Sequence, residues 1–408
     1  MCDYPTIGKR ATPNPGSSGA STAAYGARCR PLSFGVSLPE VLRRARDLTE
    51  EHIVGFHNPP SPMEVTMRTL SDKMAGTSCR RRFLARASVM GAGSFLGLPW
   101  IAAAEPSPEI TKIRLVHSPS ICFAPEYVAE DLLRQEGFSE IEYVPAEGGT
   151  LPHLVASGQA DVMMESAPTI LPLIDADRPI LILAGIHAGC YELFVRNGIR
   201  GVRDLKERTV AISVMGSASH MFIASMVAYV GMNPQREIHW LEAGTTEKAM
   251  HAFIEGRADA FIAFPPQPQQ LRAQKVGKVI VDTKQDRPWS QYYCCVAAAN
   301  RDFVVKHPVA TKRALRAILK ATDICAENPT RAARYLVTKG YELRYELALE
   351  ALSGIPYDRW RSANPQDTVH FHALRLHEAG MIKSNPEKII AQGTDWRFLN
   401  ELKEELKA

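Results

Sequence analysis

Cysteine is scarce in this 408-residue chain, and neither sign of charge is in large excess. The 8 cysteines include no C-x-x-C pair, the usual spacing in zinc and dithiol redox sites, and they are too few for a disulfide scaffold. The net charge of +4 comes with no Lys/Arg cluster interleaved with aromatic residues, so the sequence does not indicate a nucleic-acid partner. Hydrophobic residues make up 45% and charged residues 23%, the composition of an ordinary globular protein. We therefore expect no metal ion, no cofactor and no nucleic acid.

The first 73 residues lack the apolar periodicity of a folded domain. Residues 4–25 are rich in Gly, Ser, Ala, Thr and Pro, a composition that cannot bury enough apolar surface to fold. The sequence predicts a disordered extension over 1–73. The alternative is that translation starts at Met63, Met67 or Met74 and that these residues do not belong to the protein.

An export signal is predicted over residues 74–104. An arginine pair followed by Phe-Leu resembles the twin-arginine motif, and its residues are Arg80, Arg81, Phe83 and Leu84. The uncharged apolar run over 87–103 contains glycines and a proline, which make it a poor membrane anchor. It ends in a small-x-small cleavage sequence at Ala104, and no lipobox cysteine follows. We expect cleavage near Ala104, export by the twin-arginine machinery and a periplasmic location.

Two short stretches, 158–161 (GQAD) and 256–259 (GRAD), have the same local pattern. Each follows a helix-like sequence and precedes an apolar, strand-like run that ends near proline. Glycine suits the left-handed position that ends a helix, and a turn aspartate can accept hydrogen bonds from nearby backbone N–H groups. The repeat predicts two similar α/β lobes with a cleft between them, and it gives Asp161 and Asp259 a structural role.

Strand-like and helix-like stretches alternate along both halves, which predicts the α/β class and parallel sheets with right-handed crossovers. We expect a first lobe made of 111–196 plus 292–408 and a second lobe made of 199–288. From Pro308 onward the pattern is helical, so a helical C-terminal extension is expected.

Five stretches in this order resemble one family. They are 124–129 (APEYVA), 154–161 (LVASGQAD), 216–220 (GSASH), 256–260 (GRADA) and 379–382 (AGMI). The family comprises the substrate-binding proteins of bacterial ABC importers, in the NMT1/THI5-like branch with nitrate-, sulfonate-, taurine- and thiamine-precursor-binding members.

The resemblance implies a two-lobed periplasmic-binding-protein fold of the second type. Two hinge strands, 192–195 and 292–298, would join the lobes, and a ligand in the cleft would close them. The ligand is expected to be a small anionic or heteroaromatic molecule. The partners would be an ABC permease and its ATPase, and the protein is expected to be a monomer.

Ligands of α/β sheets lie beyond the carboxyl ends of the strands, and this rule nominates the loops that follow them. The candidate ligand-binding residues are Ser118, Cys122, Phe123, Gly149, Thr150, Ser166, Ala167, His187, Cys190, Tyr191, Ser217, Ser219, His220, Phe264 and Gln267. The helix start at 216–220 is the best anion site, because helix N-termini offer free N–H groups. Its serines could equally serve as simple helix caps.

Two other function classes stay open at this point. A cysteine-dependent enzyme on the same fold could use Cys122 near His117, or Cys190 near His187, as a thiolate pair. A periplasmic sensor module would hand its ligand signal to a membrane kinase instead of a permease. The neighbours Cys294 and Cys295 are expected on opposite faces of a strand, so that they could not share a metal.

Overall fold

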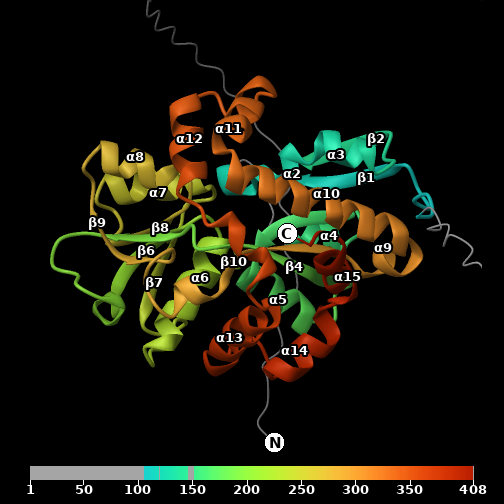
Figure 1. Cartoon of the computed structure of the whole chain (residues 1–408). Helices are drawn as coiled ribbons and strands as arrows, with labels where there is room; N and C mark the ends of the chain where they lie inside the picture. Colours follow the sequence, from blue (N-terminus) through green and yellow to red (C-terminus); the bar gives the residue numbers. More distant parts are fainter. Residues whose placement is uncertain (1–104, 119, 146–150, 408) are drawn as a thin grey trace, which may run out of the picture. The chain divides into compact units, whose positions relative to one another are not determined.

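The computed structural model describes residues 105–118, 120–145 and 151–407, all within one unit, Leu96–Ala408 (Figure 1). The signal residues Arg80, Arg81, Phe83, Leu84 and Ala104 lie outside the described residues, as do Gly149 and Thr150. The disordered extension and the export signal therefore stay predictions.

Two five-stranded sheets form the framework. The first has the order β2-β1-β3-β10-β4 and the second the order β7-β6-β8-β5-β9. The strands of the first sheet are β1 (Lys112–His117), β2 (Glu140–Pro145), β3 (Val162–Ser166), β4 (Ile180–Ala188) and β10 (Tyr293–Asn300). Those of the second are β5 (Glu192–Val195), β6 (Arg208–Ile212), β7 (Ile238–Glu242), β8 (Ala260–Ala263) and β9 (Lys278–Asp282).

Each sheet is mixed rather than wholly parallel. β1 pairs in parallel with β2 and β3, but β10 runs antiparallel between β3 and β4. In the second sheet β5 runs antiparallel between β8 and β9. The expected boundary of the first lobe at 196 is therefore corrected, because β5 pairs only with strands of the second sheet. The antiparallel strand of each sheet, β10 or β5, directly follows a connection between the lobes. No local pattern in the sequence predicts which strands it pairs with.

Helices cover both faces of the sheets. In the first lobe they are α2 (Ala124–Val128), α3 (Glu130–Gln135), α4 (Pro152–Ala156) and α5 (Ala167–Asp175), with η1 (Ile121–Phe123) before them. In the second they are η2 (Val202–Leu205), α6 (Ala218–Tyr229), α7 (Thr246–Ile254) and α8 (Gln267–Ala273), with η3 (Trp289–Gln291) on the way back. Because helices lie on both faces, β3, β4 and β10 are buried along their whole length.

The C-terminal extension is helical, as expected, and it packs on the first lobe (Figure 1). Its elements are α9 (Arg301–Lys306), α10 (Pro308–Glu327), α11 (Pro329–Thr338), α12 (Tyr345–Ser353), η4 (Tyr357–Arg361), α13 (Pro365–Glu378), α14 (Pro386–Gly393) and α15 (Arg397–Glu405). Between α14 and α15 the chain pairs with the edge of β4, where Asp395 N donates to Ile182 O at 3.0 Å. None of the helices in the described ranges is both long and apolar enough to cross a membrane.

The two glycine–aspartate stretches form the same device in each lobe. Gly158 and Gly256 have φ of +75° and +84°, as a helix stop requires. The Asp161 carboxylate accepts from Arg114 N of β1 at 2.8 Å, and the Asp259 carboxylate accepts from Thr209 N of β6 at 3.0 Å. The aspartates are thus structural, but they tie neighbouring strands together instead of closing a local turn.

Two segments connect the lobes and run side by side, the first crossover over 189–191 and the second crossover over 283–292. Tyr191 N donates to Thr283 Oγ1, and Thr283 N donates to Tyr191 O, both at 2.9 Å. Gly189 has φ +45°, and a Cβ at this position would lie 2.4 Å from Thr283 O. A glycine is therefore needed where the segments touch.

Candidate functional site

A cavity of about 310 Å³ opens between the carboxyl ends of the two sheets. Both lobes line it, which is the position that the strand-end rule predicts. The described lining residues from the first lobe and the first crossover are Ser118, Ser120, Phe123, Leu151, Glu165, Thr169 and Tyr191. Those from the second lobe are Ser213, Val214, Ser217, Ala218, Ser219, Gly244, Thr245, Thr246, Glu247 and Phe264.

Helix N-termini from the second lobe point their polar groups at this cavity. Ser217 caps α6 by accepting from His220 N at 3.5 Å, and Thr245 caps α7 by accepting from Lys248 N at 3.2 Å. The first turns of both helices lie in the cavity wall. Because the first N–H groups of a helix have no partner within it, this wall offers hydrogen-bond donors to a ligand.

Glu165 is the strongest electrostatic feature of the wall. It is the next-to-last residue of the buried strand β3, its exposed fraction is 3%, and one of its oxygens accepts from Ser166 N at 2.6 Å. Burial raises the pKa of Glu165 to about 7, although the hydrogen bond from Ser166 works in the opposite direction. Among the described lining residues there is no Lys, Arg or His to balance this carboxyl group.

Three aromatic rings give the cavity an apolar side. Phe123 lies at the end of η1, Tyr191 in the first crossover and Phe264 just after β8. The rings of Tyr191 and Phe264 stand edge to face with 5.6 Å between their centroids. Rings in this arrangement can hold a flat ligand against a face or an edge.

The structure places six of the predicted binding residues in the cavity wall. They are Ser118, Phe123, Tyr191, Ser217, Ser219 and Phe264. Four others support the wall from behind it. Ser166 and Ala167 begin α5, His220 Nδ1 accepts from Gly216 N at 3.0 Å, and Gln267 Oε1 accepts from Phe264 N at 3.3 Å.

Sequence reasoning missed 11 of the 17 described lining residues, among them Glu165, Thr169 and the α7 start at Thr245–Glu247. Glu165 could have been found in the sequence, because it lies within the apolar run before Ala167. Burial of a carboxylate costs free energy, so such a residue indicates a functional role. In the sequence, Thr245 at the α7 start indicates no more than a helix cap. Its position in the wall depends on how the two lobes are arranged, which no local pattern shows.

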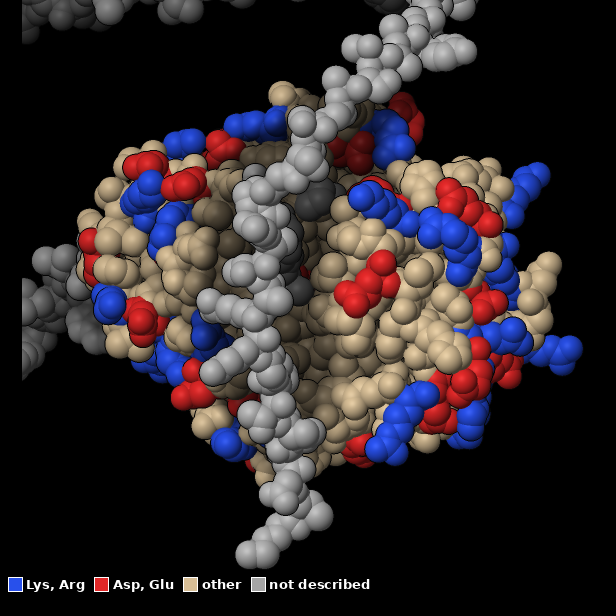
Figure 2. Space-filling model, turned by 180° about the vertical axis from the view of Figure 1, so that it is seen from behind, with Lys and Arg blue, Asp and Glu red and all other residues tan. Residues whose placement is uncertain are grey.

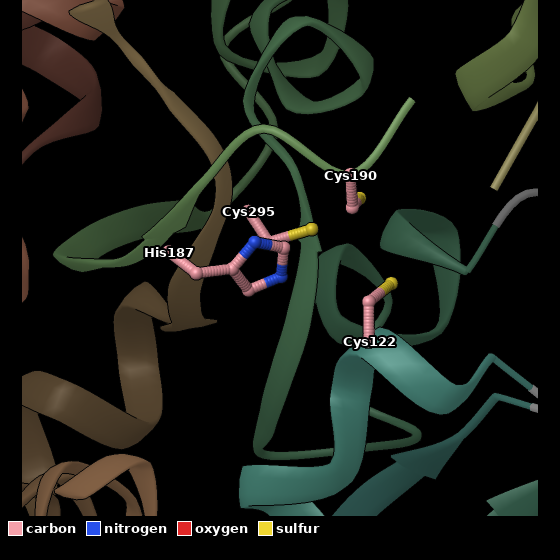
Figure 3. A group of neighbouring side chains, drawn as sticks. All are labelled: Cys122, His187, Cys190 and Cys295. Atoms are coloured by element: carbon pink, nitrogen blue, oxygen red, sulfur yellow. The ribbon is translucent and has the colours of Figure 1, made fainter. Parts of the chain in front are cut away.

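The remaining three predicted residues, Cys122, His187 and Cys190, lie outside the cavity wall and belong to a buried cluster with Cys295 (Figure 3). One ligand atom from each of the four residues can be chosen so that all lie within 4.8 Å of one another. Thiols and imidazoles are donor types that can hold a metal ion.

The expectation that Cys294 and Cys295 point to opposite faces is wrong. Their Sγ atoms lie 3.7 Å apart, and Cys294 Sγ lies 2.9 Å from Cys190 Sγ. The pairing of β10 with β4 shifts register on both sides of Cys295, and such an irregularity breaks the alternation of side chains.

On the face shown in Figure 2, charged side chains of both signs are interspersed over the outer parts of the described surface. The middle of this face, beside the undescribed residues, is mostly uncharged. This view therefore shows no broad surface of one charge sign.

Comparison with known proteins gives a family and a fold. A family model described as NMT1/THI5 like matches residues 121–332, slightly more than half of the chain. The periplasmic nitrate-binding protein NrtA from Synechocystis PCC 6803 is similar in structure, with a TM-score of 0.62 at 17% identity, over 74% of this chain and 90% of that one. A search of curated proteins gives no match.

Two further structures extend the comparison. The alkanesulfonate-binding protein SsuA from Xanthomonas axonopodis pv. citri, bound to MOPS, has a TM-score of 0.57 at 15% identity, over 72% of this chain and 100% of that one. A Candida albicans gene product described as having the generic periplasmic binding protein fold has a TM-score of 0.56 at 15% identity, over 70% of this chain and 96% of that one. At these identities the similarity shows the fold, and the expected two-lobed periplasmic-binding-protein fold is confirmed.

Proposed function

Because the chain belongs to the NMT1/THI5-like family, we propose that it is a periplasmic solute-binding protein that delivers a small molecule to an ABC permease and its ATPase. The observation that carries the proposal is the cavity of about 310 Å³, because residues of both lobes line it. A ligand that contacts both lobes stabilises their closed arrangement, and this differential contact is what drives hinge closure.

The chemistry of the wall favours a flat heteroaromatic ligand with an N–H donor, such as an aminopyrimidine. Glu165 offers a buried acceptor, and Phe123, Tyr191 and Phe264 offer ring surfaces. An anion such as nitrate or a sulfonate would meet the helix N-termini, but it would also lie in a cavity whose described charged residues are both carboxylates. Of the two expected ligand classes, the heteroaromatic one therefore fits better.

The predicted export signal supports the same role, and this prediction rests on the sequence alone. The twin-arginine motif at Arg80 and Arg81 and the cleavage sequence at Ala104 would deliver the folded lobes to the periplasm. Permease docking, a monomeric state and the absence of a nucleic-acid partner complete the proposal.

The function is tested by a thermal-shift screen of the purified protein against aminopyrimidines, nitrate, alkanesulfonates and aromatic carboxylates. An aminopyrimidine should raise Tm, because a ligand that binds only the folded state stabilises it. Its affinity should increase as pH rises through about 7, since Glu165 accepts a hydrogen bond best when ionised. A ligand that bound more tightly at lower pH would indicate an anion instead.

Two variants test whether the ligand binds in the cavity or elsewhere on the surface. Phe264→Ala should weaken binding roughly tenfold or more, since aromatic contacts contribute about 1 kcal/mol beyond buried area. Leu343→Ala is the control, because Leu343 is 84% exposed and lies outside the cavity. If no compound class shifts Tm, or if Phe264→Ala binds as the parent protein does, the proposed site is wrong.

The cysteine-dependent enzyme is less well supported. Cys122 and Cys190 are buried and do not line the cavity, and burial raises the pKa of Cys122 and raises that of Cys190 to about 11. A thiol with a raised pKa is a poor source of thiolate nucleophile. The sensor alternative uses the same ligand-binding step and differs only in the membrane partner.

A further inference from the structure

The cysteine–histidine cluster beneath the cavity joins four separate parts of the chain. Cys122 comes from η1, His187 from the end of β4, Cys190 from the first crossover and Cys295 from β10 (Figure 3). All four side chains are buried, with exposed fractions of 2% or less. A buried set of three thiols and one imidazole, drawn together over more than 170 positions of sequence, needs a reason beyond packing.

The separations fit a tetrahedral ion. With metal–sulfur bonds of about 2.3 Å and metal–nitrogen bonds of about 2.0 Å, ligand atoms around zinc lie about 3.5–3.8 Å apart. The four donor atoms already lie within 4.8 Å of one another, so small side-chain movements would complete the shell.

One ring nitrogen of His187 gives independent evidence for a bound ligand. Its Nδ1 lies 3.3 Å from Ala188 O, and because a carbonyl only accepts, this contact places the proton on Nδ1. Nε2 is then left with a free lone pair, and it is buried with no hydrogen-bond partner in the described part of the protein. A histidine whose far nitrogen is held by a carbonyl is the usual arrangement of a metal ligand.

Tyr357 supports the cluster from outside. Its hydroxyl donates to Cys122 O at 2.9 Å, and its ring stands edge to face with that of His187 at 5.1 Å. One buried side chain therefore fixes the positions of two of the four donors, as outer residues do around metal sites.

We propose that Cys122, His187, Cys190 and Cys295 form a closed structural site for a thiolate-binding metal ion, with Zn²⁺ as the reference ion. Binding deprotonates the three thiols, and three protons pass to solvent as three sulfur–metal bonds and one nitrogen–metal bond form. No electron transfer is involved. Four protein ligands leave no open position, so the site is structural and takes no part in catalysis.

The site would couple metal binding to the geometry of the ligand cavity. Cys122 precedes Phe123 and Cys190 precedes Tyr191, and both rings line the cavity wall. Cys190 also lies in the crossover that hydrogen-bonds to Thr283. An ion held there would fix the first crossover against η1 and β10.

Cys294 provides the competing chemistry. Its Sγ lies 2.9 Å from Cys190 Sγ, so a small-molecule disulfide could oxidise the two thiols to a Cys190–Cys294 disulfide. The oxidant would take up the two electrons and two protons and leave as two thiols. A Cys190–Cys294 disulfide would remove one ligand from the metal site. The two states are therefore mutually exclusive at Cys190.

The test begins with the full-length chain purified under reducing conditions and loaded with Co²⁺ alone. The expected result is one Co²⁺ per chain, the visible bands of a tetrahedral ion and a near-ultraviolet thiolate charge-transfer band, all displaced by one equivalent of Zn²⁺. Metal content by mass spectrometry and protection of three thiols from alkylation give the stoichiometry without any assay of ligand binding.

Substitutions assign the ligands. Cys295→Ser and His187→Gln should each weaken Zn²⁺ binding at least 100-fold, whereas Cys325→Ser should leave it unchanged, because Cys325 is buried outside the cluster. Cys294→Ser should retain the metal and block the competing disulfide. Circular dichroism checks that each variant is folded. If a variant does not fold, the Co²⁺ absorption spectrum of the parent protein decides whether the metal site exists.

Two outcomes would overturn the proposal. One is a fully reduced, folded protein that binds no Co²⁺ or Zn²⁺ above the level of a surface site. The other is a Co²⁺ spectrum that persists unchanged in both Cys295→Ser and His187→Gln. Failure of the ligand screen would leave this result untouched, because the metal is measured directly.

Discussion

Glu165 shows how one residue can be both poorly placed for stability and well placed for binding. Its carboxyl group is buried near the end of β3, and it accepts a hydrogen bond from Ser166 N. Burial disfavours the charged form, which is why the pKa rises from 4.5 to about 7. A group kept at such a cost inside a cavity wall is a good candidate for contact with a ligand.

The pH dependence of stability follows from this shift. Between pH 4.5 and about 7 the folded state holds a proton on Glu165 that the unfolded state has lost, so stability falls as pH rises. The full loss, reached above pH 7, is about 3 kcal/mol, since one pKa unit is worth about 1.4 kcal/mol. Below pH 4.5 both states are protonated and the loss is absent.

Glu165→Gln should therefore raise the free energy of unfolding more at pH 8 than at pH 5. Urea unfolding of parent and variant at both values measures the difference, expected to be about 2–3 kcal/mol. Glu247→Gln is the matched control, because Glu247 lines the same cavity but is exposed. An equal effect of Glu165→Gln at the two pH values would show that Glu165 does not titrate in this range.

At the scale of elements, the two glycine–aspartate stretches show how a repeat in sequence becomes a repeat in structure. Asp161 O accepts from Asn300 N, and Asp259 O accepts from Arg196 N, both at 2.9 Å. The side chain of Asn300 donates to Val155 O at the end of α4, and that of Arg196 donates to Ile254 O at the end of α7. Each aspartate, together with Asn300 or Arg196, thus links a helix end to two strands.

The two aspartates differ in one contact, and this predicts unequal effects. The Asp161 carboxylate also receives the guanidinium of Arg114, whereas that of Asp259 receives only Thr209 N among the described residues. Asp161→Asn should cost about 1–3 kcal/mol, because hydrogen bonds to charged groups contribute that much. Asp259→Asn can keep its acceptor and should cost less than about 1 kcal/mol.

Urea midpoints of the two variants, with alanine at each position as the upper limit, test this ranking. Asp358→Asn, at an exposed carboxylate, is the control. If Asp259→Asn proved the more damaging change, the ion pair with Arg114 would not account for the difference.

Local patterns were enough to predict the elements but not their partners. The run 180–186 is apolar throughout, which indicates a strand buried on both faces, and β4 spans Ile180–Ala188. Residues 192–195 were also predicted as a strand, yet assigned to the wrong sheet. The partners of β5 lie about 65–90 residues further along the chain, and side-chain periodicity carries no information about such pairing.

The same limit explains the site. Residues that follow strands were predictable from the strand-end rule, which found Ser118, Phe123 and Phe264. The cysteine cluster was not, because Cys122 and Cys295 meet only after β10 has inserted between β3 and β4. C-x-x-C spacing detects metal sites built from one hairpin, and this cluster is built from four segments.

At the scale of the whole molecule, the lobes are joined by more than the two crossovers. Helix α6 of the second lobe packs on α5 and α13 of the first. Phe222 and His372 meet there edge to face at 5.4 Å, and His372 is buried. Under the closure proposed above, the lobes would pivot on the crossovers while this packed side stays in contact.

Gly189→Ala tests the crossovers as the pivot. The new Cβ would lie 2.4 Å from Thr283 O and 2.5 Å from Lys284 Cα, so the two segments would have to separate. Gly198→Ala is the control, because Gly198 also has a positive φ, +93°, but no described atom beyond its chain neighbours lies within 4 Å of the new Cβ. The control should cost only the ~1–2 kcal/mol of left-handed strain.

The Gly189→Ala variant should lose more stability than the control, and it should also bind the cavity ligand more weakly, because Tyr191 moves with the displaced segment. Urea unfolding measures the first effect, and titration with the compound found in the thermal-shift screen measures the second. Small-angle X-ray scattering with and without that compound then reports closure, which should shrink the radius of gyration of the parent protein and of Gly198→Ala. Full closure and unchanged affinity in Gly189→Ala would place the pivot elsewhere.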